Sequence, residues 1–316
     1  MLRLTGETLH VHFLGTAGAL PTPQRSLPCI MVRRGSDTLL FDCGEGTQQQ
    51  MMRARTGFSV NAVFITHWHA DHFLGTFGLT QTLSFMGRTE PLTIYGPPGV
   101  HDFAAMVRQL SRNTVRFPVE SVELHGGSSV QFGGYGVHAF ATLHGIQSLG
   151  FLLAEEARPG RFDRERAVAL GVRPGPLFGR LQRGETIRIN RDGREVEVHQ
   201  EEVMGPPRPG RKICYTGDTR PVEDRIPDLA RGADLLIHDA TFDDRDRERA
   251  LEVHHSTAGE AGAAAAALGV RTLALVHISP RYTSTAGHIE DARRFFSGEV
   301  IAPPDLTMIE IGYRDR

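Results

Sequence analysis

The sequence predicts an α/β fold in which two similar halves each form a β-sheet flanked by helices. Short apolar runs with many β-branched residues recur in both halves, for example at residues 62–65 and 272–276. Several of these expected strands are followed at once by a histidine or an aspartate. Because ligand sites of open α/β folds lie at the carboxyl ends of strands, the repeated pattern predicts one shared site at a sheet edge.

Alternating or continuous apolar segments define the expected elements. Leu9, Val11 and Phe13 alternate with two histidines, which is typical of a half-buried strand. Helices are expected near residues 48–52 and 100–110. Strands are expected at residues 9–14, 29–34, 38–41, 62–65, 92–95, 119–124, 130–132 and 137–141, and again at 212–216, 234–237 and 272–276.

The run Thr-His-Trp-His-Ala-Asp-His at residues 66–72 is the most informative segment. His67 and His69 are spaced so that both imidazoles can converge on one ion, whereas the adjacent Asp71 and His72 project differently and can serve a second ion. Imidazole nitrogens with a carboxylate and no nearby cysteine suit zinc or a similar divalent ion in a catalytic site. The alternative is a polar helix cap with solvated histidines. It is disfavoured because such a cap does not explain four potential ligands in six positions.

Further candidate ligands follow later strands. His144, Asp218 and His277 each come just after an expected strand, and together they point to the same site. Asp42 ends the strand at 38–41, where it either supports a ligand histidine or simply begins a helix.

His255 lies just before an expected helix N-terminus, where phosphate groups are favoured. Thr257 and Glu260 have the spacing of a capping box before the alanine-rich helix 261–268, which Gly269 ends. His255 either only shapes this turn or acts on a substrate.

Composition limits the remaining choices. The chain has 316 residues, enough for one large domain or two, and its net charge of −2 does not demand a nucleic acid or a membrane. Three distant cysteines offer neither a disulfide framework nor a CxxC zinc site, which fits a reducing cytoplasm. There is no signal-peptide pattern and no apolar stretch near the ~20 residues of a membrane span. We expect a cytoplasmic protein without an organic cofactor.

Residues 158–194 differ from the rest of the chain and are expected to belong to neither a sheet nor the metal site. Glycine, proline and arginine dominate this stretch. It contains ten arginines and four acidic residues, so its net charge is +6 and that of the remaining chain is −8. Such a stretch is either a solvated surface loop or a surface for a phosphate backbone. Because no base-reading motif is visible, RNA contact here would depend on backbone and shape.

Together these motifs resemble the metallo-β-lactamase superfamily and, within it, the RNase Z family of tRNA 3′-processing endonucleases, over almost the whole chain. The metal run with His144, Asp218 and His277 is common to the superfamily. More specific are Phe-Leu-Gly-Thr-Ala-Gly-Ala-Leu-Pro-Thr at 13–22, Phe-Asp-Cys-Gly-Glu-Gly-Thr-Gln at 41–48, His-Ser-Thr at 255–257 and His-Ile-Ser at 277–279.

The resemblance implies one αββα sandwich domain over residues 1–316, with 158–194 as an inserted, flexible basic arm, and two zinc ions that cleave precursor tRNA. The implied ligands are His67, His69 and His144 for one zinc, Asp71, His72 and His277 for the other, and Asp218 as the bridge. Two divalent ions would lower the pKa of a water between them and offset charge on the scissile phosphate. Asp71 is the implied proton acceptor, and His255 the implied proton donor or phosphate contact.

The resemblance also implies substrate contacts and a homodimer in which the arm of one subunit serves the other. Arg173, Gly175 and Pro176 are similar to the family's Gly-Pro motif, which Arg180 and Arg183 follow. The loop at residues 21–26 keeps Pro21 and Arg25 of the family's Pro-x-Lys-x-Arg-Asn pattern, but has Pro23 and Ser26 at the other places. Because this loop is associated with the CCA end of tRNA, the departure leaves the response to CCA open.

Three other functions remain to be compared with this one. A phosphodiesterase or exoribonuclease acting on other RNAs or small phosphodiesters would share the metal centre. A β-lactamase or thioester hydrolase would not need a cationic arm. An RNA-binding protein with an inactive site is disfavoured by the complete ligand set.

Overall fold

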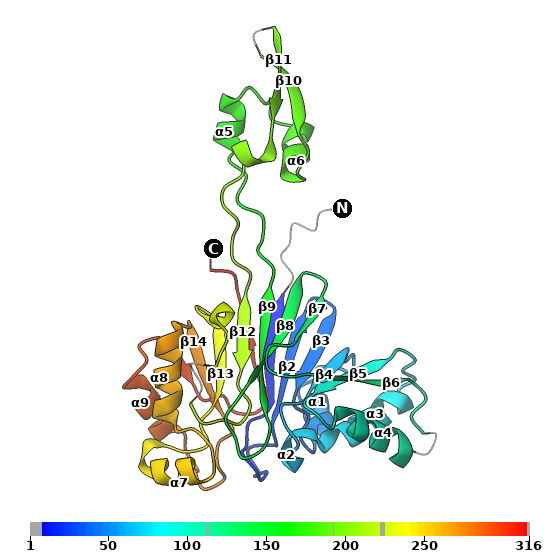
Figure 1. The fold of residues 1–316 in the computed structure, drawn as a ribbon, viewed down its shortest axis with the longest axis vertical. Helices are drawn as coiled ribbons and strands as arrows, with labels where there is room; N and C mark the ends of the chain where they lie inside the picture. Colours follow the sequence, from blue (N-terminus) through cyan, green and yellow to red (C-terminus); the bar gives the residue numbers. More distant parts are fainter. Residues whose placement is uncertain (1–7, 112–113, 192, 222–224, 315–316) are drawn as a thin grey trace. The chain divides into compact units, whose positions relative to one another are not determined.

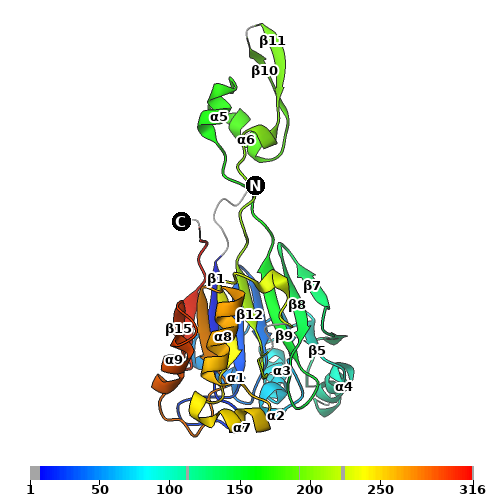
Figure 2. The same ribbon diagram turned by 60° about the vertical axis from the view of Figure 1, so that its left-hand side comes forward.

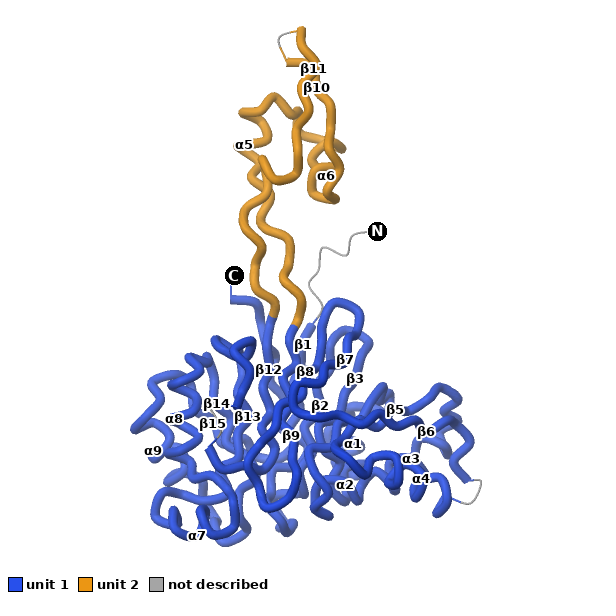
Figure 3. The backbone as a smooth tube through the Cα atoms, in the orientation of Figure 1, with its two compact units in different colours: residues 1–154, 211–316 blue, residues 155–210 orange. Residues whose placement is uncertain are grey.

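The computed structural model describes residues 8–111, 114–191, 193–221 and 225–314. The backbone separates into two compact units, one comprising Met1–Ala154 with Arg211–Arg316 and the other Glu155–Gly210 (Figure 3). All strands expected from the sequence lie in the first unit. Among the described residues, no helix has the length and apolar content needed to cross a membrane.

Two seven-stranded mixed sheets form the first unit, in the orders β16-β1-β2-β3-β4-β5-β6 and β15-β14-β13-β12-β9-β8-β7 (Figure 1). The first contains β1 (Leu9–Gly15), β2 (Cys29–Arg34), β3 (Asp37–Phe41), β4 (Ala62–Phe64), β5 (Leu92–Gly96), β6 (Val119–Glu123) and β16 (Thr307–Glu310). The second contains β7 (Ser129–Phe132), β8 (Tyr135–Ala141), β9 (Leu149–Glu155), β12 (Lys212–Tyr215), β13 (Leu235–Asp239), β14 (Thr272–Val276) and β15 (Glu299–Ile301). Each strand expected from the sequence is present within two residues at either end.

Three strands of this unit were not expected. β9 is buried along its whole length, and a continuous apolar run of this kind cannot be told from a buried helix by periodicity. β15 and β16 are short strands at the sheet edges. They carry too few residues for a clear period-2 pattern.

Helices cover the outer faces of both sheets, which confirms the four-layer αββα arrangement (Figures 1 and 2). On the first sheet lie α1 (Thr47–Arg53), α3 (Gly75–Phe85) and α4 (Val100–Leu110), which share an apolar cluster with β2, β3, β4 and β5. On the second lies α8 (Ala258–Leu268), packed against α9 (Ala286–Arg293). Shorter helices are α2 (Ala70–Phe73) and α7 (Arg247–Glu252), with 3-10 turns at Asp228–Ala230 and Asp244–Asp246; a further 3-10 turn, Gln200–Glu202, lies in the second unit.

A layer of aromatic side chains fills the space between the two sheets. Phe41 and Phe64 stack with ring centroids 5.3 Å apart, and both lie against Phe151 of the other sheet. Tyr215 joins this layer at the end of β12, where its ring is 6.4 Å from that of Phe41. The carboxyl ends of β3, β4 and β12 are thereby held together across the sandwich.

The capping box before α8 is confirmed. Thr257 accepts a hydrogen bond from the amide of Glu260, whose carboxylate accepts one from the amide of Thr257. The helix begins at Ala258 rather than 261, because the capping residue itself directly precedes the first turn. Gly269 ends it in a left-handed conformation, with φ of 61°.

The second unit contains α5 (Arg164–Ala169), α6 (Pro176–Gln182) and a hairpin of β10 (Ile187–Arg191) with β11 (Arg194–Val198). The expectation that residues 158–194 lie outside any sheet is therefore wrong for the hairpin. Ile187 and Ile189 alternate with polar residues and are buried in a small apolar cluster with Val172, Leu181 and Val198. This cluster gives the unit a core of its own.

Candidate metal centre

The loop after β4 and the first turn of α2 place four predicted ligands side by side. His67 and His69 lie in the extended segment that follows the strand, and Asp71 and His72 lie in the helix that begins at Ala70. His144 follows β8, Asp218 follows β12 and His277 follows β14. The structure therefore brings all seven side chains to one edge of the two sheets, as the strand ends predicted.

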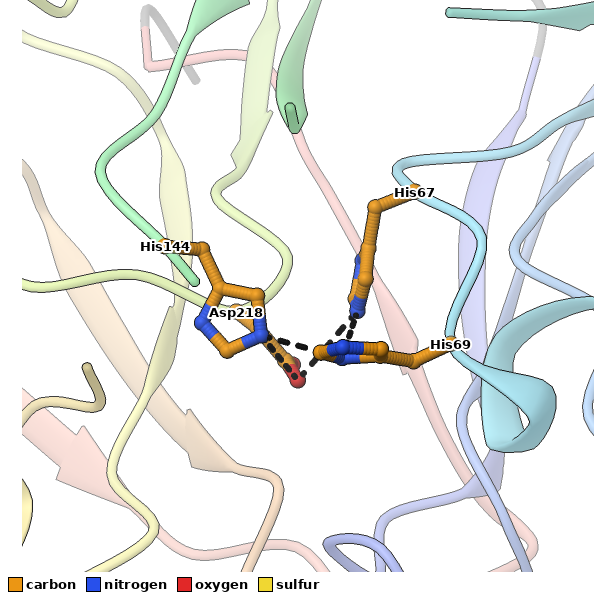
Figure 4. A group of neighbouring side chains, drawn as sticks. All are labelled: His67, His69, His144 and Asp218. Atoms are coloured by element: carbon orange, nitrogen blue, oxygen red, sulfur yellow. Dashed lines mark hydrogen bonds and ion pairs between the residues drawn. The ribbon is translucent and has the colours of Figure 1, made fainter. Parts of the chain in front are cut away.

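Three histidines form the first ligand group. His67 Nε2 is 3.0 Å from His69 Nδ1, which is 3.1 Å from His144 Nε2 (Figure 4). All three nitrogens face one point, and Asp218 Oδ2 lies 3.7 Å from His67 Nε2. This is the donor set of a three-histidine metal position with one carboxylate oxygen.

Asp71, His72 and His277 form the second group. Asp71 Oδ2 is 3.5 Å from Nε2 of both histidines, and Asp218 Oδ2 is 3.3 Å from the same two nitrogens. One oxygen of Asp218 thus lies within reach of both groups. Nε2 of His72 and of His277 are buried, and neither has a hydrogen-bond partner among the described residues. Buried acceptor nitrogens in this state fit a metal ion.

The protonation states of the first histidine group and of Asp218 also fit a metal. Burial lowers the pKa of His67, His69 and His144, which keeps these imidazoles in the neutral form that binds metal. Burial raises the pKa of Asp218, but the nearby His277 and His72 lower it by more. The pKa of Asp218 therefore lies well below the usual range. The bridge position is therefore a carboxylate at neutral pH.

Asp42 orients a predicted ligand histidine, so it does more than begin a helix. Its Oδ2 accepts from Nδ1 of His72 at 2.8 Å, and its Oδ1 accepts from the amide of Thr66 at 2.8 Å. The Thr66 hydroxyl is 3.0 Å from Asp42 and 2.9 Å from Nδ1 of His67. One carboxylate therefore orients a ligand in each group.

Several supporting residues were missed by sequence reasoning. Thr241 places its hydroxyl 2.8 Å from Nδ1 of His277, and Asp239 accepts from the amide and hydroxyl of Thr241. Asp239 does end a strand, which is the signal that identified the predicted ligands, whereas Thr241 carries no comparable signal.

His255 lies beside the centre. Its ring stacks on that of His277 with centroids 5.0 Å apart, and its Nδ1 is 2.8 Å from Asp239 Oδ2. Burial lowers the pKa of His255, but Asp239 outweighs this effect and raises the pKa to about 9. The imidazole is therefore protonated at neutral pH and can donate a proton.

The opening loop packs directly on the second ligand group. The amide of Ala19 donates to Asp71 Oδ2 at 3.1 Å, and a Cβ on Gly18 would lie 2.7 Å from Nδ1 of His277. The guanidinium of Arg25 donates to Thr16 Oγ1 and to the carbonyl of Pro303. Arg25 also lines a cavity of about 410 Å³. Its contact with substrate stays a prediction.

The other predicted substrate residues lie in the second unit. Gly175, with φ of 150°, caps α6, and Pro176 is the first residue of that helix. Arg173 is exposed, while Arg180 and Arg183 each pair with Glu185. The whole unit contains eleven arginines and ten acidic residues, so its net charge is only +1. The positive charge is therefore confined to part of the unit. These contacts with tRNA also stay predictions.

Comparison with known proteins gives a consistent result. The sequence profile of the metallo-β-lactamase superfamily matches residues 24–277. The chain is 51% identical over 308 residues to a ribonuclease Z of Methanosarcina acetivorans, covering 97% of this chain and 99% of that protein. It is 46% identical to a ribonuclease Z of Myxococcus xanthus, covering 97% and 99%. The crystal structure of human tRNase Z, short form, matches with a TM-score of 0.67 and 28% identity, covering 96% and 99%.

These matches extend over nearly the whole length of the curated relatives, and the superfamily match spans the positions from His67 to His277. The chain belongs to the metallo-β-lactamase superfamily and, within it, to the ribonuclease Z family.

Proposed function

We propose that this chain is a two-zinc endoribonuclease that removes the 3′ trailer from precursor tRNA, cutting near the discriminator base to leave a 3′-hydroxyl. The observation that carries the proposal is the pair of ligand groups that share Oδ2 of Asp218. Their nitrogen and carboxylate donors suit zinc. One relative named ribonuclease Z is 51% identical to this chain.

The proposed roles follow from the geometry. His67, His69 and His144 would hold one ion and Asp71, His72 and His277 the other, and Asp218 would be shared by the two groups. When bound, two divalent ions supply Lewis acidity toward a water and the scissile phosphate. Asp71 accepts a proton from the attacking water, and its carboxylate is available because His277 helps hold its pKa below the usual range against the opposing effect of burial. His255 donates a proton to the leaving oxygen.

The second unit provides the proposed contact with tRNA. Arg173 is exposed beside the Gly175–Pro176 turn, and residues 158–194 carry the unit's excess of arginine. Phosphate contacts of this kind position an RNA without reading its sequence. The tRNA would therefore be recognised by its shape and backbone.

A homodimer is part of the proposal. Large apolar side chains are exposed on neighbouring helices of the first unit: Met52 on α1, Leu74 and Phe85 at the two ends of α3, and Met86 next to it. We place a second copy of the chain on this surface, since exposed apolar groups cluster where proteins associate. Light scattering should give twice the chain mass, and Leu74→Asp should lower it.

We place the protein in the cytoplasm, in keeping with three buried cysteines that are free thiols.

The test is to map the 3′ ends produced from one precursor tRNA, made with and without an encoded CCA, by protein whose metal content is measured. We expect two zinc ions per chain and a single cut that releases the trailer, with the two RNAs reporting the effect of CCA. Stepwise shortening from the 3′ end would instead indicate an exoribonuclease. Tight RNA binding without a cut would indicate an inactive RNA-binding protein.

A further inference from the structure

Tyr215 makes a polar contact inside the mainly apolar layer between the two sheets. It is the last residue of β12, only 4% of it is exposed, and its hydroxyl donates to Asp42 Oδ2 at 2.8 Å. Asp42 follows β3 of the opposite sheet and is fully buried. The hydrogen bond therefore joins the two halves of the sandwich directly beneath the metal centre.

Asp42 is the point where several donors meet. Its two oxygens accept from Tyr215 Oη, from Nδ1 of His72 and from the amide and hydroxyl of Thr66. Asp42 also has a left-handed backbone, with φ of 58°, a conformation that is uncommon for residues other than glycine. The carboxylate is thus fixed from both sheets.

This arrangement sets which nitrogen each ligand presents. A carboxylate only accepts, so Nδ1 of His72 donates to it and Nε2 is the nitrogen left to face a metal. The Thr66 hydroxyl has one proton, which it gives to Asp42, so it accepts from Nδ1 of His67. His67 Nε2 is then left with its lone pair. The same carboxylate orients one ligand in each group.

We propose that Tyr215 is a positioning residue that, through Asp42, holds His72 and His67 in their metal-binding orientations and so links metal affinity to the packing of the two sheets. This inference rests on the metal centre of the proposed function, but not on the identity of the RNA. Without the hydroxyl, Oδ2 of Asp42 loses its donor from the second sheet. Nδ1 of His72 would then be held by a carboxylate that has lost its contact with the second sheet.

Tyr215 remains a donor throughout the working pH range. Burial raises the pKa of its phenol well above the usual value, and Asp42 raises it further. The contact therefore depends on packing and geometry alone.

The experiment compares Tyr215→Phe with Tyr135→Phe as the matched control. Tyr135 is buried in the same apolar cluster, and its hydroxyl donates to Asp37 at 3.1 Å, away from the ligands. Zinc affinity is measured by competition with a chromophoric chelator, with no RNA present. Since loss of groups that support metal ligands typically weakens binding about 10- to 100-fold, we expect about a tenfold weaker affinity for at least one zinc in Tyr215→Phe. Tyr135→Phe should bind zinc as the parent does.

The inference is overturned if Tyr215→Phe binds both ions as tightly as the parent, or if Tyr135→Phe loses as much affinity. Denaturant unfolding of the zinc-free proteins shows whether each variant folds, and an Asp42→Asn variant that keeps the parent's zinc affinity would also overturn it. If Tyr215→Phe weakens zinc binding but the parent leaves precursor tRNA uncut, the proposed function fails while this inference stands.

Discussion

Asp239 Oδ2 lies 2.8 Å from Nδ1 of His255. This hydrogen bond occupies one ring nitrogen, so Nε2 is the nitrogen that can act on a substrate. Asp239 is fully buried and is held in turn by the amides of Thr219 and Thr241. The pair therefore has a fixed geometry beside the metal ligands.

The pH dependence of cleavage should reveal this pair. Because Asp239 raises the pKa of His255 against the opposing effect of burial, replacing it with asparagine should lower that pKa. A proton donor acts below its pKa, so the alkaline limb of the rate in Asp239→Asn should move to lower pH. Single-turnover rates across pH measure the shift. An alkaline limb at the parent's position would exclude His255 as the proton donor.

Arg220 and Glu260 should stabilise the loops around the site. The guanidinium binds both carboxylate oxygens of Glu260 and the carbonyl of His255, and both side chains are about nine-tenths buried. Arg220→Met leaves Glu260 without its bidentate partner, and breaking such a buried pair costs about 3–5 kcal/mol of unfolding free energy. Urea denaturation of the metal-loaded protein measures the loss.

The matched control for Arg220 is Arg249→Met. Arg249 pairs with Glu252 on the surface of α7, where both side chains are exposed. An exposed pair contributes at most about 1 kcal/mol. Equal losses of unfolding free energy in the two variants would show that the Arg220–Glu260 pair stabilises the protein no more than an exposed pair does.

Replacing residues 156–209 with a short glycine-rich turn should separate RNA binding from the chemistry. Ala154 of β9 and Lys212 of β12 are antiparallel partners, so the cut ends are neighbours and a hairpin turn can join them. We expect slower cleavage of precursor tRNA but an unchanged rate on a small phosphodiester such as bis(p-nitrophenyl) phosphate. If precursor tRNA is cut at the parent's rate, the second unit does not serve substrate binding.

The candidate metal centre could be predicted because its residues follow strands, and the apolar pattern of each strand can be recognised within a few consecutive residues of the sequence. His67 to His72 are near neighbours in sequence, and His144, Asp218 and His277 each come just after a strand end. Tyr215 could not be identified in this way, because its partner Asp42 is 173 residues away and the contact depends on how the sheets pack. The hairpin of the second unit was missed because arginine and glutamate on its exposed face obscure Ile187 and Ile189.

Asp71 tests the central claim most directly, because it is both a proposed ligand and the proposed proton acceptor. Single-turnover cleavage of precursor tRNA should be at least about 100-fold slower for zinc-supplemented Asp71→Ala than for the parent. Asp228→Ala, which removes an exposed carboxylate of a surface pair, should retain the parent's rate. An Asp71→Ala protein that releases the trailer as fast as the parent would contradict the proposed metal-dependent mechanism.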